Sequence, residues 1–305
     1  MSKINHVYQG ITDLIVKAIE NDGLTNKTVS WASLGGGLPL NPTTKRSYNG
    51  INTLVLSLTA QNRGYSQSMW AGYKQWINVG CKINSSARGN GVFVLFAKPI
   101  HETDEESGDV ISTHWLYNYQ RVFNIAHVDG WQSNEAISQL VKERTLDDSR
   151  DFSQADQQNV ENLVQACGVK IVESFQASYS PHEDVVRMPP MYAFEQGASA
   201  LEAAESYYAV LLHELTHWTM HPTRCNRDNS DYAFEELVAE LGSAFLCQRF
   251  GVTQRPREDH ANYIASWLRK LKNDNRAIVK AANKAQRACD FLENYANQYS
   301  IAIAA

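Results

Sequence analysis

The stretch Tyr207-Tyr-Ala-Val-Leu-Leu-His213-Glu214-Leu-Thr-His217-Trp218 decides the fold of the second half of this chain. It contains good helix formers and neither Gly nor Pro, so it predicts an α-helix. Residues four apart lie on one face of a helix, which allows the imidazoles of His213 and His217 to bind one metal ion. Glu214 lies about 100° further round the helix, near enough to accept a proton from a metal-bound water. The pattern therefore predicts a catalytic metal centre with Glu214 as its general base.

A third ligand is expected on a second helix, because a catalytic zinc takes three protein ligands and leaves a fourth position open. Residues 232–246 predict that helix and place Glu236 and Glu240 on one face, with eighteen residues between His217 and Glu236. This spacing resembles the gluzincin metallopeptidases, in which HExxH is followed by a helix bearing ExxxD or ExxAD. The resemblance implies that Glu236 is the third ligand and that Glu240 orients a ligand histidine. Glu235 is expected to point elsewhere.

Other interpretations of these residues stay open. HExxH is short enough to arise by chance, and a histidine on an apolar helix is usually packed and satisfied by one hydrogen bond. Three convergent buried ionisable groups need a cation to be tolerated, so we expect one Zn²⁺ per chain, with Mn²⁺ as an alternative. A purely structural zinc site would usually have four protein ligands and no free base.

Weaker candidates surround the expected centre. His221 follows His217 by four residues but precedes Pro222, where the helix should end, so we expect it beside the site or facing solvent. Tyr232 could stabilise an oxyanion, although burial between helices is the simpler expectation. Residues 182–188, HEDVVRM, are expected to form an edge strand along which an extended peptide could align.

The overall composition is that of a globular protein, with 43% hydrophobic and 20% charged residues. At 305 residues the chain is long enough for two domains with separate cores. The charge is divided too: the first 100 residues hold ten Lys and Arg against three acids, a net charge of +7, whereas the remainder carries −12. A basic half beside an acidic one suggests that the N-terminal half meets a polyanion such as nucleic acid.

The cysteines and the start of the chain indicate the compartment. The five cysteines are widely spaced and form no CxxC pair, so neither a disulfide framework nor a thiolate zinc site is indicated. The first ten residues lack the apolar segment of a signal peptide, and no run approaches the roughly 18 apolar residues of a membrane span. We therefore expect a cytoplasmic protein with no membrane partner.

The expected fold class is α+β, with two domains. Residues 1–130 are assigned to an N-terminal α+β domain, and residues 131–156 to a polar linker with a short helix at 135–144. Residues 157–305 are assigned to a mainly helical domain with a small sheet. The elements expected in the first domain are a helix at 7–19, a helix at 69–79 carrying Trp70, Tyr73 and Trp76, and paired strands at 91–97 and 119–126. Strands at 169–173 and 184–188 are expected in the second.

Two sets of motifs, in matching order, resemble the ArdC family of antirestriction proteins and its plasmid and phage relatives, some of them called TraC primase-like proteins. The C-terminal set consists of HELTHW, HPTRCNR and FEELVAELGSAFL. The N-terminal set, between Tyr8 and Ala126, consists of Ile11-Thr12-Asp13, Trp31, Asn41, Tyr48-Asn49-Gly50-Ile51-Asn52, Trp70, Tyr73-Lys74-Gln75, Gly80 and Val122-Phe123-Asn124. Together the two sets span most of the chain.

The resemblance implies an N-terminal domain that binds single-stranded DNA and a C-terminal zincin-like metallopeptidase domain, which protect incoming plasmid or phage DNA from restriction. Single strands are held by cationic grooves with aromatic faces on which bases stack. The residues that offer this combination are Lys45, Arg46, Tyr48, Trp70, Tyr73, Lys74, Lys82 and Arg88. Alternatively, the tryptophans are core and the lysines are merely solvated. After Gly80, where relatives tend to be more basic and Gly-rich, residues 81–89 of this chain are less so, which weakens the expected DNA affinity there.

Three hypotheses about function follow. In the first, Glu214 serves as base in peptide hydrolysis while the neighbouring domain engages single-stranded DNA. In the second, DNA binding alone performs the task and the metal site is structural or regulatory. In the third, a protease acts on DNA-bound proteins generally and is stimulated by single strands. The protein substrate is left open, with restriction-system subunits and proteins that coat entering DNA as candidates.

Overall fold

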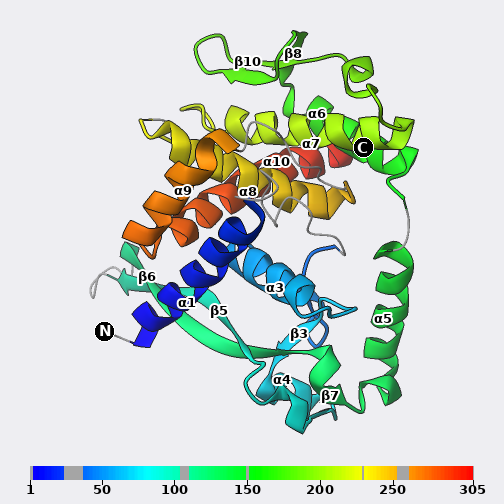
Figure 1. Ribbon diagram of the computed structural model, residues 1–305, viewed down its shortest axis with the longest axis vertical. Helices are drawn as coiled ribbons and strands as arrows, with labels where there is room; N and C mark the ends of the chain where they lie inside the picture. The colour runs from blue at the N-terminus through cyan, green and yellow to red at the C-terminus, as the bar shows by residue number, and fades with distance from the viewer. Residues whose placement is uncertain are drawn as a thin grey trace.

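The computed structural model describes residues 3–23, 37–103, 110–148, 151–228, 230–252 and 261–304, and shows an α+β chain rich in helices (Figure 1). The helices are α1 (Lys3–Ala18), α3 (Ile51–Asn62), α4 (Tyr73–Asn78), α5 (Glu135–Asp148), α6 (Gln154–Cys167), α7 (Ala200–Trp218), α8 (Tyr232–Phe250), α9 (Ala261–Asn273) and α10 (Ala277–Ala304). The strands are β1 (Leu40–Asn41), β2 (Arg46–Ser47), β3 (Trp70–Gly72), β4 (Lys82–Ile83), β5 (Val92–Thr103), β6 (Val110–Asn124), β7 (Val128–Asp129), β8 (Lys170–Glu173), β9 (Ser178–Ser180) and β10 (Val185–Met188).

Local capping signals fix the ends of α7 and α8. Ser199 caps α7: its hydroxyl accepts a hydrogen bond from the Glu202 amide, while the Glu202 carboxylate accepts one from the Ser199 amide. Asp231 caps α8 by accepting a hydrogen bond from the Phe234 amide at 3.0 Å. The same helix ends at Gly251, whose φ of 70° is the left-handed conformation that suits glycine.

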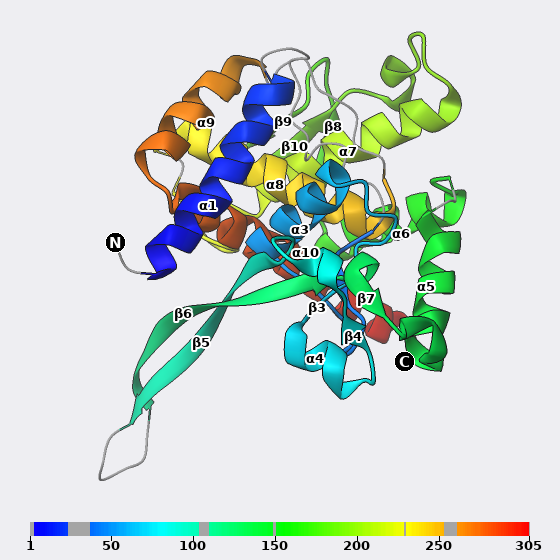
Figure 2. The same cartoon turned by 60° about the horizontal axis from the view of Figure 1, so that its bottom comes forward.

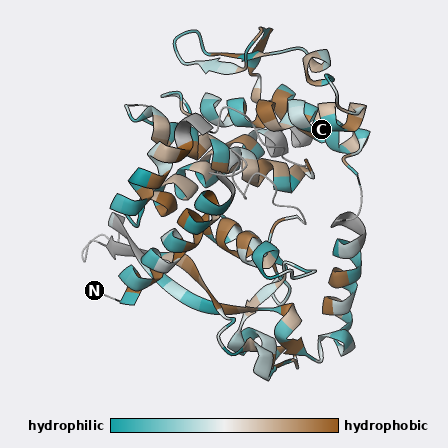
Figure 3. Cartoon of the chain, viewed as in Figure 1, coloured by the Kyte–Doolittle hydropathy of each residue, from teal (hydrophilic) through white to brown (hydrophobic). Residues whose placement is uncertain are grey.

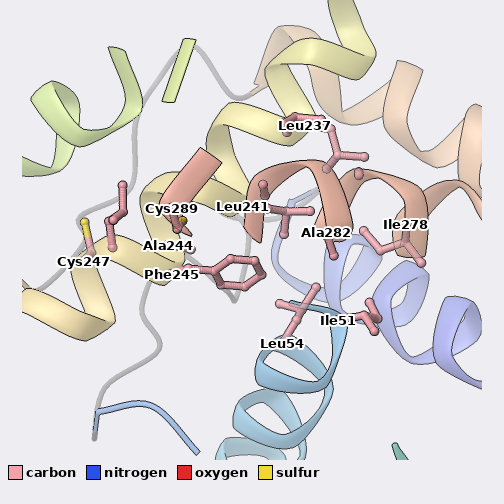
Figure 4. Packing of buried hydrophobic residues seen from close by; sticks show 14 of the residues in the cluster. Ile51, Leu54, Leu237, Leu241, Ala244, Phe245, Cys247, Ile278, Ala282 and Cys289 are labelled. Atoms are coloured by element: carbon pink, nitrogen blue, oxygen red, sulfur yellow. The ribbon is translucent and has the colours of Figure 1, made fainter. Parts of the chain in front are cut away.

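The two halves of the sequence share one hydrophobic core. Nine of the twelve residues of α3 are buried, and hydrophobic residues, brown in Figure 3, run along this helix in the middle of the molecule. Figure 4 shows Ile51 and Leu54 of α3 beside Ile278 and Ala282 of α10 and Phe245 of α8. Where the chain length predicted separate cores, the main hydrophobic cluster therefore contains residues of both halves.

Hydrogen bonds reinforce the same junction. The Gly50 amide donates to Gln286 Oε1 at 2.8 Å, and Gln248 Nε2 donates to Ser57 Oγ at 3.2 Å. The N-terminal helix α1 lies beside α9 in both views of the molecule (Figures 1 and 2). Residues near the start of the chain thus help to build the environment of the C-terminal helices.

The N-terminal half contains a three-stranded antiparallel sheet with the order β3-β6-β5. The expected pairing of the strands near 91–97 and 119–126 is confirmed, since Val92 lies opposite Val122 and Leu95 lies opposite Tyr119. Figure 2 shows that the β5–β6 hairpin extends away from the helices. The edge strand β5 is anchored to α3 through Asn52, whose amide side chain bonds both the Leu95 amide and carbonyl.

The helix expected at 69–79 is wrong in its first turn. Trp70–Gly72 form β3, which pairs with β6, and α4 begins only at Tyr73. Gly72 sits so close to β6 that a Cβ there would lie 2.0 Å from Gln120 Nε2. Both Trp70 and Trp76 are fully buried, so pairing with the sheet and burial of the indole rings outweigh the helical spacing of the aromatic residues.

The segment expected as a linker contains a long helix that packs on the N-terminal half. α5 spans fourteen residues, more than the short helix expected at 135–144. Its Ile137 joins Trp76, Ile125 and Val128 in a second, smaller hydrophobic cluster. The polar face of α5 explains why the sequence of this segment resembles a connection.

A second small sheet has the order β8-β10-β9. β10 pairs in parallel with β8 and antiparallel with β9, so its backbone groups are occupied on both sides. The expectation that residues 182–188 form an edge strand is therefore wrong, because β10 is central and the edges belong to β8 and β9. Among the helices in the described ranges, none is both long enough and apolar enough to cross a membrane.

Candidate functional site

The histidines of α7 face a carboxylate of α8. Glu236 Oε2 lies 3.5 Å from His213 Nε2, and Glu236 Oε1 lies 3.4 Å from His217 Nε2. The imidazole centroids are 4.8 Å apart, as the four-residue spacing requires. All three side chains are buried, and one ligand atom from each lies within 4.8 Å of the other two. The structure thus brings together the three residues expected to bind metal.

The spacing of these atoms suits a divalent ion. In a tetrahedral site with bonds of about 2.0–2.1 Å, neighbouring ligand atoms are about 3.3–3.5 Å apart. Each imidazole Nε2 lies at about this distance, 3.5 Å for His213 and 3.4 Å for His217, from a different oxygen of Glu236, so the carboxylate faces both rings. Two imidazoles and one carboxylate are ligands that both Zn²⁺ and Mn²⁺ accept. Three ligands rather than four would leave a coordination position for water or substrate.

Each histidine is also held through its second ring nitrogen. His213 Nδ1 lies 3.0 Å from Glu240 Oε1, and His217 Nδ1 lies 3.5 Å from Glu235 Oε1. Carboxylates in these positions fix the orientation and tautomer of a ligand imidazole. Glu240 occupies the place that the gluzincin resemblance implied. The expectation that Glu235 points elsewhere is wrong, because α8 crosses α7 so that Glu235 and Glu236 lie on either side of His217.

Arg227 anchors Glu235 from the loop that follows α7. Its guanidinium bonds both carboxylate oxygens of Glu235 at distances from 2.6 to 3.2 Å. It also donates to Thr219 Oγ1 at 2.6 Å and to the Thr216 carbonyl at 2.7 Å. The Arg227 and Glu235 side chains are each only 3% exposed. This arginine was noticed in the sequence only as part of HPTRCNR, and nothing in its spacing signalled the burial that gives it a role.

A second arginine of that loop, Arg224, binds the C-terminal end of α7. Arg224 Nε donates to the Trp218 carbonyl at 2.6 Å, and the guanidinium lies 3.9 Å from the centroid of the Trp218 ring. It also bonds Asp184 and the Tyr179 hydroxyl, which connects the small sheet to the helix. A cation at a helix C-terminus is favourable because the carbonyl ends are partly negative. The hydrogen bonds from Arg224 hold the pKa of Asp184 below its ordinary value.

The buried charges of the centre shift one another's pKa values. Burial lowers the pKa of His217, but hydrogen bonds with Glu235 and Glu236 outweigh burial and raise it to about 10. Burial raises the pKa of Glu236, yet contacts with His213 and His217 hold it well below its ordinary value. Burial also raises the pKa of Glu235, but His217 and Arg227 outweigh burial and lower that pKa below its ordinary value. When no metal is bound, His217 is therefore protonated at neutral pH and the carboxylates beside it are charged.

A close helix crossing sets these distances. At Gly242 of α8, a Cβ would lie 2.5 Å from Thr216 Cγ2 and 2.7 Å from Thr216 Oγ1, so only glycine allows α7 to approach this near. Next to it, Ser243 Oγ donates to the Ala209 carbonyl at 3.0 Å. The glycine and the serine together fix how α8 lies along α7.

The other residues predicted near the centre, Glu214, His221 and Tyr232, lie at different places on α7, just beyond its end and on α8. Glu214 is buried on α7, at 4% exposure, and its charge acts on His217. His221 lies beyond the end of α7, where its Nδ1 is 2.8 Å from Thr223 Oγ1. Tyr232 opens α8 and is 61% exposed, so the expectation that it is buried between helices is wrong.

The DNA-binding candidates divide between surface and core. Trp70 is fully buried, and its indole nitrogen donates to Ser68 Oγ, so it cannot stack on a base and this expectation is wrong. Tyr48 is half-buried and donates its hydroxyl to the Trp70 carbonyl at 2.9 Å. The candidates that do reach solvent are Lys45, Arg46, Tyr73, Lys74, Lys82 and Arg88.

Comparisons with known proteins match both halves of the chain. Residues 5–141 match the family described as the N-terminal domain of anti-restriction factor ArdC, and residues 158–284 match the zincin-like metallopeptidase family. The crystal structure of metal-free antirestriction protein ArdC from plasmid R388 superposes with a TM-score of 0.75 at 33% identity, covering 95% of this chain and 98% of that one. The Mn(II)-bound structure of the same protein gives a TM-score of 0.72 at 33% identity, covering 95% of this chain and 97% of that one.

Two further proteins are similar to this chain in sequence. An uncharacterized protein of Sinorhizobium fredii, y4eC, is 32% identical over 302 residues, which cover 94% of this chain and 91% of the relative. A DNA primase TraC of Escherichia coli is 31% identical over 280 residues, which cover 85% of this chain but 24% of TraC. The chain therefore corresponds to about a quarter of that primase.

Proposed function

Because the chain belongs to the ArdC family of antirestriction proteins, we propose that its N-terminal half binds single-stranded DNA and that its zincin-like domain is a metal-dependent peptidase. In this proposal the protein engages plasmid or phage DNA as it enters and protects it from restriction. The observation that supports the peptidase is the convergence of His213, His217 and Glu236 beside the buried Glu214.

The residues of the centre have distinct proposed roles. His213, His217 and Glu236 would hold a divalent cation, which supplies the Lewis acidity that makes a water molecule a nucleophile near neutral pH. Zn²⁺ is the proposed ion, and Mn²⁺ is the alternative, since ArdC of plasmid R388 has a Mn(II)-bound structure. Glu214 is the proposed general base, because it adjoins a ligand histidine and is not itself among the three ligands. Glu240 and Glu235 keep the two imidazoles in place.

Metal content and peptide cleavage, measured on one set of variants, test this proposal. Wild type should carry about one equivalent of metal by mass spectrometry, as a single three-ligand site requires. His213→Ala and Glu236→Ala should lose it, while Glu214→Gln should retain the metal and lose hydrolysis of a peptide library. A Glu214→Gln variant that still cleaves peptides would refute the assigned base. Metal that survives both ligand substitutions would exclude the site itself.

A second candidate function is favoured by the burial of the centre. The exposures of 2% for His213, 4% for Glu214 and 8% for His217 leave little surface for a peptide to reach. In this alternative the metal stabilises the domain and DNA binding alone gives antirestriction. A transfer assay into a restricting host separates the two, because Glu214→Gln would then protect DNA as well as wild type.

The partners follow from the same proposal. Single-stranded DNA is the proposed ligand of the N-terminal half, and restriction subunits or proteins bound to entering DNA are the proposed peptidase substrates, which would place the protein in the cytoplasm. Peptide cleavage that increases when single strands are added would favour DNA-bound proteins as substrates.

A further inference from the structure

A cavity of about 470 Å³ lies in the N-terminal half, between α4, the segment 83–91 and β6. Its size is within the range of about 300–1,000 Å³ that small-molecule sites occupy. Tyr73 and Arg88, two of the DNA-binding candidates from the sequence, meet in its lining. Arg121 and Phe123 of β6 complete it, and neither was noticed in the sequence as a DNA-binding residue.

The lining combines cations with aromatic rings. Arg88 and Arg121 are exposed, and no carboxylate is among the described residues that line the cavity. Tyr73 is 58% exposed and Phe123 is half-buried, so ring surface is available from two elements. The Arg121 guanidinium lies 4.6 Å from the centroid of the Phe93 ring, which holds its position. This chemistry favours an anion that carries a flat ring.

A second cavity shows that this charge pattern is not general. It measures about 570 Å³ and lies beside the C-terminal sheet. Its lining balances Lys170 and Arg224 with Glu183 and Asp184. An anion therefore has less reason to bind there than in the N-terminal cavity.

Gly91, in the wall of the N-terminal cavity, leaves space for the side chain of Arg121. A Cβ at position 91 would lie 2.5 Å from Arg121 Cδ and 2.9 Å from Phe123 Cε1. Any side chain at Gly91 would therefore displace both residues.

Hydrogen bonds hold the wall of the cavity in place before any ligand binds. Ser86 Oγ lies 2.7 Å from His127 Nδ1, and His127 Nε2 lies 2.6 Å from the Tyr65 hydroxyl. Asn90 Nδ2 donates to the Ser86 carbonyl at 2.7 Å, and Arg63 donates to the Asn90 carbonyl at 2.7 Å. A wall that is already ordered loses little conformational entropy on binding.

We propose that this cavity receives one nucleotide of a single DNA strand, with its base against Tyr73 and Phe123 and its phosphate at Arg88 and Arg121. The inference rests on the single-strand binding proposed above and names the place where the strand is gripped. Base stacking on aromatic rings tolerates every base, and arginine binds phosphate through paired hydrogen bonds. A duplex must first unpair before it delivers a base to such a cavity, which gives a preference for single strands.

Fluorescence anisotropy of the full-length protein with a labelled oligothymidine of about 12 nucleotides tests the proposal, together with a matched strand of abasic deoxyribose phosphates. The variants are Tyr73→Ala, Tyr73→Phe and Arg121→Ala. Lys17→Ala is the control, because Lys17 is an exposed cation on α1 in the same half, does not line the cavity and is not one of the DNA-binding candidates. Thermal unfolding confirms that each variant is folded, and free thymidine monophosphate serves as a competitor.

Tyr73→Ala should weaken binding of the thymidine strand by about fivefold or more and leave the abasic strand unchanged, whereas Tyr73→Phe should retain stacking. Arg121→Ala should weaken both strands and reduce the slope of log affinity against log salt by about one. Equal losses of affinity with Lys17→Ala and Tyr73→Ala, or no loss with Tyr73→Ala, would overturn the assignment of the cavity while leaving single-strand binding intact. Thymidine monophosphate that binds as tightly as the strand would also overturn it. Wild type that binds no single strand refutes the proposed function as well.

Discussion

Replacing Glu235 by glutamine should destabilise the fold and weaken metal binding by two separable routes. Glutamine keeps the shape of the side chain but removes the charge that faces Arg227, at 2.6 to 3.2 Å, and His217, at 3.5 Å. The Arg227 guanidinium would then be a buried cation without its anion. Removing one partner of a buried ion pair costs about 3–5 kcal/mol of unfolding free energy, and the lower end applies here because an amide oxygen can still accept a hydrogen bond.

The metal route acts through His217. Substitution of a carboxylate that orients a ligand imidazole typically lowers metal affinity about 10- to 100-fold, or about 1.4–2.7 kcal/mol. Urea unfolding with chelator present reports the first route alone. Competition with a chromophoric chelator reports the second. Glu183→Gln is the control, since that carboxylate is 55% exposed beside Arg187 and its loss should change stability by no more than about 0.5 kcal/mol.

A double substitution separates the two routes further. Arg227→Met together with Glu235→Gln removes both charges, so it should recover much of the stability that Glu235→Gln loses. Metal affinity should stay low in the double variant, because His217 still lacks its carboxylate. A cost below about 1 kcal/mol for Glu235→Gln, or strictly additive effects in the double variant, would show that the pair is not the buried interaction described here.

Three further predictions concern His217, Gly242 and Asp184. Because His217 has a pKa of about 10 when no metal is bound, metal binding at pH 7 should release a proton, and the metal affinity should rise about tenfold per pH unit up to pH 9. Calorimetry in buffers of different ionisation enthalpy measures the number of protons released. Metal binding without proton release would contradict the prediction. Gly242→Ala should lower the free energy of unfolding in urea by about 1–3 kcal/mol, because the methyl group of the alanine would overlap Thr216. An unchanged free energy of unfolding would mean that α7 and α8 can move apart without loss of stability. The folded pKa of Asp184 lies below its unfolded value, so its pairing with Arg224 stabilises the fold above about pH 4 and is lost as pH falls through the folded pKa. Asp184→Asn should therefore lower the free energy of unfolding in urea at pH 7, by less than about 1 kcal/mol because the side chain is partly exposed. This loss should shrink as pH falls through the folded pKa, and a loss that does not depend on pH would contradict the assignment.

The sequence alone determined the parts of the molecule that depend on local geometry. The four-residue spacing of His213 and His217 on a Gly-free and Pro-free helix places both rings on one face, whatever else surrounds that helix. The spacing that resembles gluzincins directed attention to Glu236, and the apolar run at 91–97 predicted a strand whose expected partner at 119–126 does pair with it. In each case, backbone periodicity restricts where a side chain can point before any tertiary contact forms.

Only the tertiary structure decided how these elements meet. Glu235 and Glu236 are neighbours about 100° apart on one helix, and both reach His217 only because Gly242 lets α8 cross α7 closely. Trp70 has the helical spacing of an exposed aromatic face but lies in a buried strand, since pairing with β6 overrides that spacing. Arg227 became part of the centre only through burial against Glu235. Local periodicity orients side chains within an element, whereas crossing angles and burial arise from contacts between residues far apart in the chain, and these leave no fixed spacing in a single sequence.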